Sequence, residues 1–446
     1  MNRKTFLKTA ALAGAAGMVM PKFSLGAGLG SDKIKVAFVG LGGRGTGALI
    51  NMVDADENIE IVAAGELFPE RVEAAKKKLS EHLGRKYKGN GQKKFAEIWK
   101  TTGDTTFYGL DAIDKVLQTN ADVVALVTPP CFRTPHIEKC LKAGKNVFAE
   151  KPVCVDATQL RKIYNELVPL ADSKGLKILC GTQMRYHSAI QEAVNRVRDG
   201  QIGDIIAADF LRYESSYLHG WYDVPKNLKP DDVEYQIREW LAFRWTSGDQ
   251  IVEQYVHNLD MALWAIGKLP VEVVGWRRQI DIPYPERGDR FSNCHAQYEF
   301  EDGASLTAAC RQEDNTSPYA PFKVFGTKGT LLMSFGKQRI LGEKPWESDY
   351  QKKPELICEH EALFGAIRNG TPFNTLKTCA DSCFVAIAGR ESCYAGKRLK
   401  LTGFGKIASR IWFPTILSLQ TKPWKKFPSA ASTSLFDVPC CKCAYL

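Results

Sequence analysis

The feature that most constrains this fold is a glycine-rich turn set between an apolar run and a helical stretch. Residues 34–39 read as a buried strand, and Gly40-Leu41-Gly42-Gly43-Arg44-Gly45 follows at once. In a strand–turn–helix unit, G-x-G-x-x-G spacing is typical of dinucleotide binding. One glycine makes the tight turn, one admits the pyrophosphate, and one lets the helix pack on the strand. The phosphates then lie at the positive end of that helix.

A carboxylate stands where such a domain grips a ribose. The next expected strand, residues 60–66, ends on Glu66, 21 residues after Gly45. A carboxylate at this place hydrogen-bonds the ribose hydroxyls and repels a 2′-phosphate. The sequence therefore predicts NAD as the cofactor in preference to NADP.

Strands and helices alternate up to about residue 180, which predicts a doubly wound parallel sheet. We expect helices at 69–83, 110–118, 136–143 and 157–174, strands at 122–127, 146–149 and 176–180, and an inserted loop or short helix within 84–104. Longer alternating runs at 206–213, 271–278, 291–299 and 304–311, with a hairpin at 326–333, predict a largely antiparallel sheet. Helices are expected again at 354–369 and 380–394.

The expected fold class is α/β, with an N-terminal Rossmann domain and a C-terminal α/β domain built on a large open sheet. We divide the chain into a leader (1–30), an NAD-binding domain (31–155), a substrate and oligomerisation domain (156–402) and an atypical tail (403–446). The last helices of the third segment are expected to pack back on the first domain. The tail lacks clean periodicity, and we expect it to be poorly ordered, with a reading-frame error near residue 402 as one hypothesis.

The net charge of +10 lies mostly at the two ends of the chain. Residues 1–30 contribute +4 and residues 403–446 contribute +5, which leaves +1 for the body. The body has no basic stripe, so we expect no nucleic-acid partner.

The first residues read as a targeting segment. A basic start is followed by an apolar run at 9–20, too short to span a bilayer. It resembles a twin-arginine signal with Arg3-Lys4 in place of two arginines. We therefore expect a periplasmic protein without a stable membrane anchor, and a cytoplasmic protein with a disordered leader is the alternative.

Thirteen cysteines are present, most of them single and inside apolar runs. Such thiols fit a protein that folds in a reducing cytosol, which is compatible with export of an already folded chain. We expect no metal site.

Six motifs, in order along residues 34 to 400, resemble those of the glucose–fructose oxidoreductase / inositol dehydrogenase / rhizopine (Gfo/Idh/MocA) family. They are the glycine-rich turn, Thr128-Pro129-Pro130 with His136, Gly144-Lys145-Asn146-Val147-Phe148-Ala149-Glu150-Lys151-Pro152, Gly181-Thr182-Gln183-Met184-Arg185-Tyr186, Gly200-Gln201-Ile202-Gly203, and Glu253-Gln254-Tyr255-Val256-His257-Asn258-Leu259-Asp260. The resemblance implies a Rossmann domain followed by an α/β domain whose open sheet often forms the oligomer interface.

The resemblance also implies the catalytic residues. Lys151 matches the family lysine that hydrogen-bonds the substrate hydroxyl and the nicotinamide, His257 matches the catalytic histidine, and Glu253 stands where an aspartate is usual. The expected cofactor-binding residues are Gly40, Gly42, Gly43, Arg44, Gly45, Glu66, Thr128, Pro129, Pro130, His136, Glu150 and Lys151.

These residue types suit hydride transfer from a carbinol carbon. The alcohol proton needs a base, for which His257 is suited near pH 7. The developing alkoxide needs a cation, which Lys151 supplies. Glu253, one helical turn before His257, would share its face and orient the imidazole.

The substrate side is expected to lie in an aromatic-rich segment before His257 and at the end of the strand near residue 180. Aromatic faces can stack on a sugar ring, although those side chains could equally be core or a subunit contact. Asp260 could orient the imidazole or face the substrate. The expected substrate-binding residues are Gln183, Arg185, Tyr186, His219, Trp221, Arg244, Trp245 and Asp260.

The leading functional hypothesis is an NAD-dependent oxidoreductase acting on a secondary hydroxyl of a sugar, sugar derivative or glycoside. Export would require a tightly bound, internally regenerated cofactor. One alternative is an NAD-dependent glycosidase of the α-N-acetylgalactosaminidase kind, although those relatives lack the lysine that this chain keeps at 151. A second is a non-catalytic protein that retains NAD, against which Lys151 and His257 both argue. An open sheet face predicts a homodimer or homotetramer.

Overall fold

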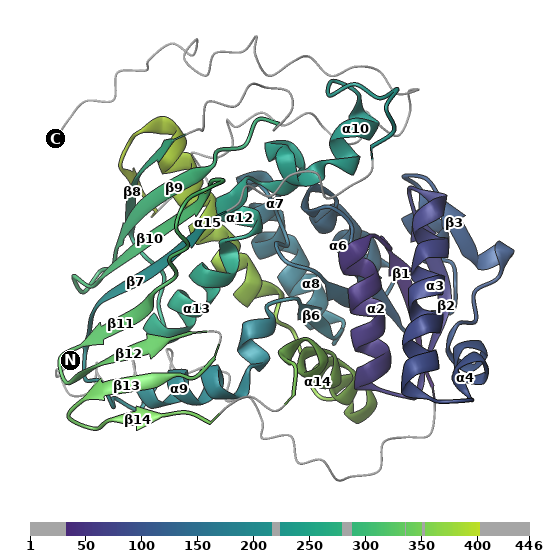
Figure 1. The fold of residues 1–446 in the computed structure, drawn as a ribbon, viewed down its shortest axis with the longest axis horizontal. Coiled ribbons are helices and arrows are strands. Elements are labelled where there is room, and N and C mark those ends of the chain that lie inside the picture. The colour runs from purple at the N-terminus through teal and green to yellow at the C-terminus, as the bar shows by residue number, and fades with distance from the viewer. Residues whose placement is uncertain (1–32, 216–223, 279–287, 335, 350–352, 402–446) are drawn as a thin grey trace. The chain divides into compact units, whose positions relative to one another are not determined.

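The computed structural model describes residues 33–215, 224–278, 288–334, 336–349 and 353–401 (Figure 1). The expected leader, the tail and two of the expected substrate residues, His219 and Trp221, lie outside these ranges. The domain boundaries expected at residues 155 and 402 stay predictions.

The first sheet has six parallel strands in the order β3-β2-β1-β4-β5-β6, as predicted for a doubly wound domain. Apolar side chains dominate its central strands, which are buried on both faces. The strands are β1 (Ile34–Val39), β2 (Ile59–Glu66), β3 (Thr106–Tyr108), β4 (Val123–Leu126), β5 (Asn146–Ala149) and β6 (Ile178–Cys180). The edge strand β3 was not expected.

Helices connect these strands and cover the sheet (Figure 1). They are α2 (Gly43–Ala55), α3 (Pro69–Lys86), α4 (Gly91–Ile98), α5 (Ala112–Val116), α6 (Arg133–Lys142), α7 (Ala157–Lys162) and α8 (Val168–Ser173). A π-helical turn at Ile163–Leu167 joins α7 to α8, so the long helix expected at 157–174 forms with one irregular turn. Helix α4 occupies the stretch expected as a loop or short helix.

The second sheet has nine strands in the order β14-β13-β12-β11-β7-β10-β9-β8-β15. The strands are β7 (Ile205–Glu214), β8 (Glu272–Arg278), β9 (Asn293–Glu299), β10 (Ser305–Gln312), β11 (Phe322–Gly326), β12 (Gly329–Met333), β13 (Arg339–Gly342), β14 (Trp346–Glu347) and β15 (Leu399–Lys400). Neighbouring strands are antiparallel, as predicted, except that β7 and β10 pair in parallel.

The helices of this second part pack mainly on one face of the large sheet or against the first domain. They are α9 (Ser188–Arg198), α10 (Val233–Arg238), α11 (Arg244–Ser247), α12 (Gln250–Glu253), α13 (Val256–Ile266), α14 (Glu355–Asn369) and α15 (Leu376–Ala395). Helix α14 lies against α2, where Arg368 Nη2 is 2.8 Å from Asp56 Oδ2.

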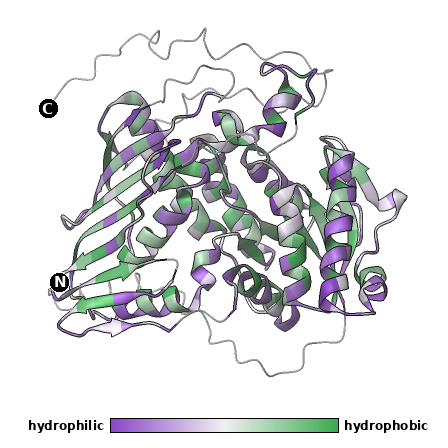
Figure 2. Ribbon diagram, in the orientation of Figure 1, coloured by the Kyte–Doolittle hydropathy of each residue, from purple (hydrophilic) through white to green (hydrophobic). Residues whose placement is uncertain are grey.

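The other face of the large sheet lacks a helical layer among the described residues. Burial alternates along its strands, and Figure 2 shows the matching mixture of hydrophilic and hydrophobic colour. Trp276 is 59% exposed, and Ile206, Val274 and Leu341 are also exposed.

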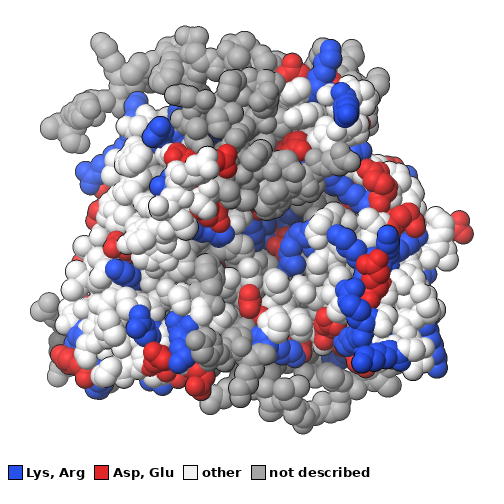
Figure 3. Space-filling model, viewed as in Figure 1, with Lys and Arg blue, Asp and Glu red and all other residues white. Residues whose placement is uncertain are grey.

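Acidic and basic side chains are interspersed over the face seen in Figure 3. No helix among the described residues has both the length and the apolar character needed to cross a bilayer. The described residues likewise contain no group of three or more potential metal ligands.

Candidate active site and cofactor cleft

A cleft of about 790 Å³, part of it open to solvent, lies at the carboxyl ends of β1, β2 and β4. This is where open parallel sheets bind nucleotides. Its walls are formed by Val39, Gly40, Gly42, Gly43, Arg44, Gly45, Gly65, Glu66, Leu67, Phe68, Arg71, Gly109, Leu110, Ala112, Ile113, Val127, Thr128, Pro129, Phe132, His136, Ile237 and Trp240. Nine of the twelve expected cofactor residues are among them; Pro130, Glu150 and Lys151 are not.

The glycines of the turn are where close approach requires them. Gly40 has φ +93°, and a Cβ on it would lie 2.7 Å from the carbonyl carbon of Val127. A Cβ on Gly45 would lie 2.2 Å from the Gly40 oxygen. By contrast, nothing lies within 4 Å of a Cβ built on Gly43, so the backbone there is open to the cleft. This cradle, at the start of α2, fits a pyrophosphate.

Glu66 is held at the cleft wall by main-chain donors. Its Oε2 accepts from the Leu41 amide at 2.6 Å, and its Oε1 accepts from the amides of Leu67 and Phe68 at 2.7 and 3.2 Å. Carboxylate oxygens each have two acceptor sites, so these bonds leave capacity for hydroxyl donors. The position fits a ribose.

Two polar atoms beside the cleft are buried without a hydrogen-bond partner in the described structure, Thr128 Oγ1 and His136 Nδ1. Burial, with the charges of Lys139 and Arg133, lowers the pKa of His136 to about 3, so this imidazole is neutral. The cradle, the carboxylate and these free polar atoms together fit a nicotinamide dinucleotide.

Arg44 connects the glycine-rich turn to two buried carboxyl groups. Its Nε donates to Glu150 Oε1 at 2.5 Å, and its Nη2 lies 3.6 Å from Glu359 Oε1. Burial and the Glu150 charge raise the pKa of Glu359 well above its usual value, against the opposing effect of Arg44. Glu359 is therefore the group that takes up a proton at this cluster. Glu359 was not among the residues expected at the site.

Lys151 follows the end of β5 and makes two hydrogen bonds to Glu253. Its Nζ donates to Glu253 Oε1 at 2.8 Å and to the Glu253 carbonyl oxygen at 2.5 Å. Each side chain is 10% exposed. An ammonium group has three donors, and within the described residues both acceptors belong to Glu253. One N–H of Lys151 is therefore left for a further oxygen.

His257, in the first turn of α13, is half-buried and neutral. Burial lowers its pKa well below the usual value, and the charges of Lys151, Arg212 and Arg44 lower it further. Among the described residues its imidazole has no hydrogen-bond partner. The neutral His257 imidazole can therefore accept a proton close to the positive charge of Lys151.

Glu253 and His257 lie on successive short helices, α12 and α13, and not on one continuous helix as expected. A turn at Gln254 and Tyr255 interrupts the helix. Tyr255 is fully buried, and its hydroxyl donates to the Phe210 carbonyl oxygen. The Glu253 carboxylate contacts Lys151 and has no hydrogen bond to the imidazole within the described structure. The contact expected between Glu253 and the imidazole is therefore not seen, and the carboxylate bonds Lys151 in its place.

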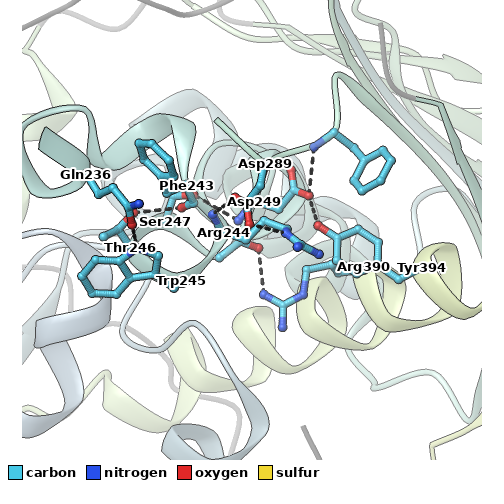
Figure 4. A network of polar contacts seen from close by, with 12 residues as sticks. Gln236, Phe243, Arg244, Trp245, Thr246, Ser247, Asp249, Asp289, Arg390 and Tyr394 are labelled. Carbon is cyan, nitrogen blue, oxygen red and sulfur yellow. Dashed lines mark hydrogen bonds and ion pairs between the residues drawn. The ribbon is translucent and has the colours of Figure 1, made fainter. Parts of the chain in front are cut away.

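A polar network fixes the start of α12 (Figure 4). Asp249 has φ +76°, an uncommon conformation for a residue with a side chain, and it is fully buried. Its Oδ2 accepts from the Phe291 amide at 3.2 Å and from the Tyr394 hydroxyl, and Arg390 Nη1 donates to the carbonyl oxygens of Val155 and Gly248 at 2.8 Å each. The loop after Lys151 and the turn before Glu253 are thus tied to α15.

The expected substrate residues Arg185 and Asp260 contact each other. Arg185 Nε and Nη2 donate to the Asp260 carboxylate at 2.9–3.1 Å, and Ser382 Oγ donates to it at 2.7 Å. Asp260 is 1% exposed. Its carboxylate is therefore enclosed by protein donors, while Arg185 is half-buried.

Arg244 and Trp245 are likewise bound within the protein. Arg244 Nε donates to Asp289 Oδ2 at 3.0 Å, and Trp245 Nε1 donates to Gln236 Oε1 at 2.7 Å (Figure 4). Gln183 is half-buried and Tyr186 is buried, both on the turn Gln183–Tyr186 after β6. Their roles toward substrate stay predictions.

Several residues of these sites, Glu359 among them, were not assigned from the sequence. Arg212, on β7, is close enough to His257 for its charge to lower the imidazole pKa. Ile237 and Trp240 line the cofactor cleft from the second part of the chain. The aromatic-rich stretch before His257 was the available signal, but it was assigned to substrate.

Two family models match the chain. Residues 34–181 match the model described as "Oxidoreductase family, NAD-binding Rossmann fold", and residues 190–332 match the GFO/IDH/MocA C-terminal domain.

Individual relatives agree with these matches. The chain is 24% identical over 384 residues to scyllo-inositol 2-dehydrogenase (NAD(+)) of Bacillus subtilis, covering 83% of this chain and 96% of that protein. It is 23% identical over 269 residues to 2,7-anhydro-N-acetylneuraminate hydratase of Escherichia coli, covering 56% and 64%.

Solved structures share the fold. Levoglucosan dehydrogenase in complex with NADH and levoglucosan superposes with a TM-score of 0.62 at 15% identity, over 83% of this chain and all of that one. Aldose–aldose oxidoreductase from Caulobacter crescentus gives 0.61 at 19% identity, over 82% and 99%.

Proposed function

The chain belongs to the Gfo/Idh/MocA oxidoreductase family, and from that premise we propose that it oxidises a secondary hydroxyl of a sugar, sugar derivative or glycoside with bound NAD. The observation that carries the proposal is the pairing of Lys151, with one free N–H, and His257, neutral and without a partner among the described residues. A donor for an alkoxide and an acceptor for its proton lie beside a dinucleotide cleft.

In this mechanism the substrate hydroxyl lies between Lys151 and His257. His257 takes the hydroxyl proton, which its lowered pKa leaves it free to accept at neutral pH. The remaining N–H of Lys151 donates to the oxygen as negative charge develops on it. The nicotinamide, when bound, supplies the hydride acceptor.

Glu253 acts on Lys151 in this scheme. Its two contacts fix the ammonium group and orient the third N–H. Asp249 and Arg390 fix the start of α12, so the network in Figure 4 also holds Glu253 in position to contact Lys151. A preorganised donor gains most of its effect from being held before the reaction begins.

A polyhydroxylated ring is the substrate class supported by the relatives. The relatives include a scyllo-inositol dehydrogenase and a levoglucosan dehydrogenase. We propose NAD in preference to NADP because the Glu66 carboxylate is held by three main-chain amides at the place where a 2′-phosphate would lie.

The hydratase relative favours a second candidate, a closed redox cycle in which oxidation of one carbon permits elimination at its neighbour. The cofactor is then reduced and reoxidised within one turnover. Such an enzyme would hydrolyse a glycoside without net change in NADH.

The first test is the cofactor content of protein purified without added nucleotide. After denaturation, released NAD(H) and NADP(H) are quantified by mass spectrometry, and the protein is then assayed with inositols, anhydrosugars and glycosides. NADH formation with one of these classes supports the dehydrogenase. Glycoside cleavage without NADH, with deuterium from D2O entering the sugar at carbon, supports the closed cycle. A protein that binds neither nucleotide would contradict both.

We also propose export by the leader and assembly through the open face of the large sheet. Exposed apolar residues on that face, including Trp276 and Val274, support a self-association surface. Cell fractionation tests the first proposal. Light scattering with a Trp276→Glu variant tests the second, because the variant is expected to be smaller in solution.

A further inference from the structure

One wall of the cofactor cleft comes from outside the first sheet. We call residues 233–242, which comprise α10 and the 3-10 helix Trp240–Ala242, the strap. Ile237 and Trp240 of the strap line the cleft together with Glu66 and Phe68 at the end of β2. Since a carboxylate at the end of β2 marks the ribose of the adenosine half, the strap stands at the adenosine end.

The strap is packed onto the nucleotide domain by a separate apolar cluster. Val233 and Ile237, both 2% exposed, pack with Phe68 after β2 and with Cys131 and Phe132 after β4. This cluster is distinct from the main core of the molecule. The strap therefore has its own docking surface on the rim of the cleft.

Arg238 adds a polar attachment at the same place. Its guanidinium carbon lies 3.7 Å from the centre of the Phe68 ring, and its Nη1 lies 2.9 Å from Glu70 Oε1. Its Nε bonds Glu234 on the strap itself at 3.0 Å. Arg238 thus connects the strap to the first turn of α3, which follows the Glu66 carboxylate.

A second polar attachment joins α10 of the strap to α11, the short helix that follows it in sequence. Trp245 Nε1 donates to Gln236 Oε1 at 2.7 Å (Figure 4). Gln236 Nε2 donates to the Pro230 carbonyl oxygen at 2.9 Å. The strap is therefore bound both to the nucleotide domain and to α11.

We propose that the strap completes the cofactor site, with Trp240 and Ile237 covering the adenosine half and Arg238 latching the strap to Phe68 and Glu70, so that the dinucleotide is retained between turnovers. An indole face suits stacking on adenine, and an apolar Ile237 excludes water beside it. In this arrangement the adenosine half leaves only when the latch opens. The inference rests on the proposed dinucleotide binding.

The test is the rate at which bound NADH leaves the full-length protein. Protein loaded with NADH is mixed with excess NAD+, and the loss of NADH fluorescence gives the release rate. Trp240→Ala removes the cover, and Arg238→Met removes the cation while keeping an unbranched side chain. We expect each to release NADH at least tenfold faster than the unaltered protein.

Arg196→Met is a matched control. Arg196 also bonds a glutamate on its own helix, Glu192 at 2.7 Å, and its guanidinium lies 4.5 Å from the Trp346 ring, but it does not line the cleft. Its release rate is expected to equal that of the unaltered protein. Circular dichroism establishes folding. If Arg238→Met does not fold, Arg238→Gln, which also removes the cation, makes the same comparison.

Release rates within twofold of the unaltered protein for Trp240→Ala and the Arg238 variant would overturn the proposal while leaving the function intact. Faster release from Trp240→Ala alone would overturn the latch. An unaltered protein that binds no NADH would instead overturn the proposed function, and the inference with it.

Discussion

The Lys151 ammonium lies 2.8 Å from Glu253 Oε1, which joins the end of β5 to the short helix before His257. The two residues are 102 positions apart in sequence, and each side chain is largely enclosed. This ion pair therefore joins the first sheet to the helices that carry the proposed base.

Replacing Lys151 with Met should lower kcat at least 100-fold, because the developing alkoxide loses its only proposed cation. Cofactor content should stay near that of the unaltered protein, since Lys151 does not line the cleft. Steady-state kinetics with nucleotide quantification checks both parts. A kcat within threefold of the original would remove Lys151 from the mechanism.

Glu253→Gln and Glu253→Asp should each lower kcat by about tenfold, a smaller loss than removal of a direct transition-state donor. The aspartate is shorter by about 1.5 Å, the length of one carbon–carbon bond, so it forfeits the 2.8 Å contact. The backbone carbonyl contact at 2.5 Å remains in both variants. The readout is kcat against KM: a positioning role moves kcat with little change in KM.

The acid limb of the pH profile should lie well below pH 6.5. The pKa of His257 is lowered by burial and by three nearby cations, so the imidazole stays neutral and able to accept a proton as the pH falls through 6.5. We expect kcat/KM to be flat between pH 8 and 6.5 when measured in buffers of constant ionic strength. A half-maximal point at or above 6.5 would show that another group controls activity. His257→Asn should abolish the limb and cost about 100-fold or more in rate.

Glu66→Ser should shift cofactor preference toward NADP. The substitution removes the charge that repels a 2′-phosphate, while Arg71 in the same wall offers a cation. The ratio of kcat/KM for NAD to that for NADP should fall at least tenfold. Glu60→Ser, on the same strand but outside the cleft, is the control and should leave the ratio unchanged.

The half-buried, neutral His136 should make stability fall in acid. Its folded pKa of about 3 is below the unfolded value near 6.5, so the unfolded chain binds the extra proton as the pH drops below 6.5. Between pH 7.5 and pH 5 this single group should lower the free energy of unfolding by about 2 kcal/mol. Denaturant unfolding of His136→Gln at both pH values should show a correspondingly smaller difference. An unchanged difference would contradict the assignment.

The sequence predicted the long elements of the fold because their periodicity is strong. The two sheets, the helix after the glycine-rich turn and the hairpin between β11 and β12 all follow the expected pattern. The edge strand β3 was missed because it has three residues, too few for alternation to register. The break between α12 and α13 was missed because burial of Tyr255 under β7, a tertiary contact, overrides the local helical pattern.

At the site, the residues of short motifs were predictable and their partners were not. The glycine-rich turn is recognisable from its spacing within one strand–turn–helix unit, and Glu66 from its place at the end of the next strand. The bonds from Arg185 to Asp260 and from Arg244 to Asp289 join residues 75 and 45 positions apart, so no local pattern reveals them. The strap could not be predicted for the same reason. Ile237 and Trp240 contact the cleft only in the folded chain, where the two sheets lie together.

The parallel pairing of β7 with β10 has a kinetic consequence. Ala207 pairs with Ser305, so the centre of the large sheet forms only when a segment of almost one hundred residues has closed into a loop. That loop contains the strap, Glu253 and His257. Pairings so distant in sequence form slowly, because the entropy of closure is lost before the contacts form. Assembly of the sheet and assembly of the catalytic helices are thereby coupled, and a nascent chain acquires its site only after synthesis has passed residue 312 and β10 is complete.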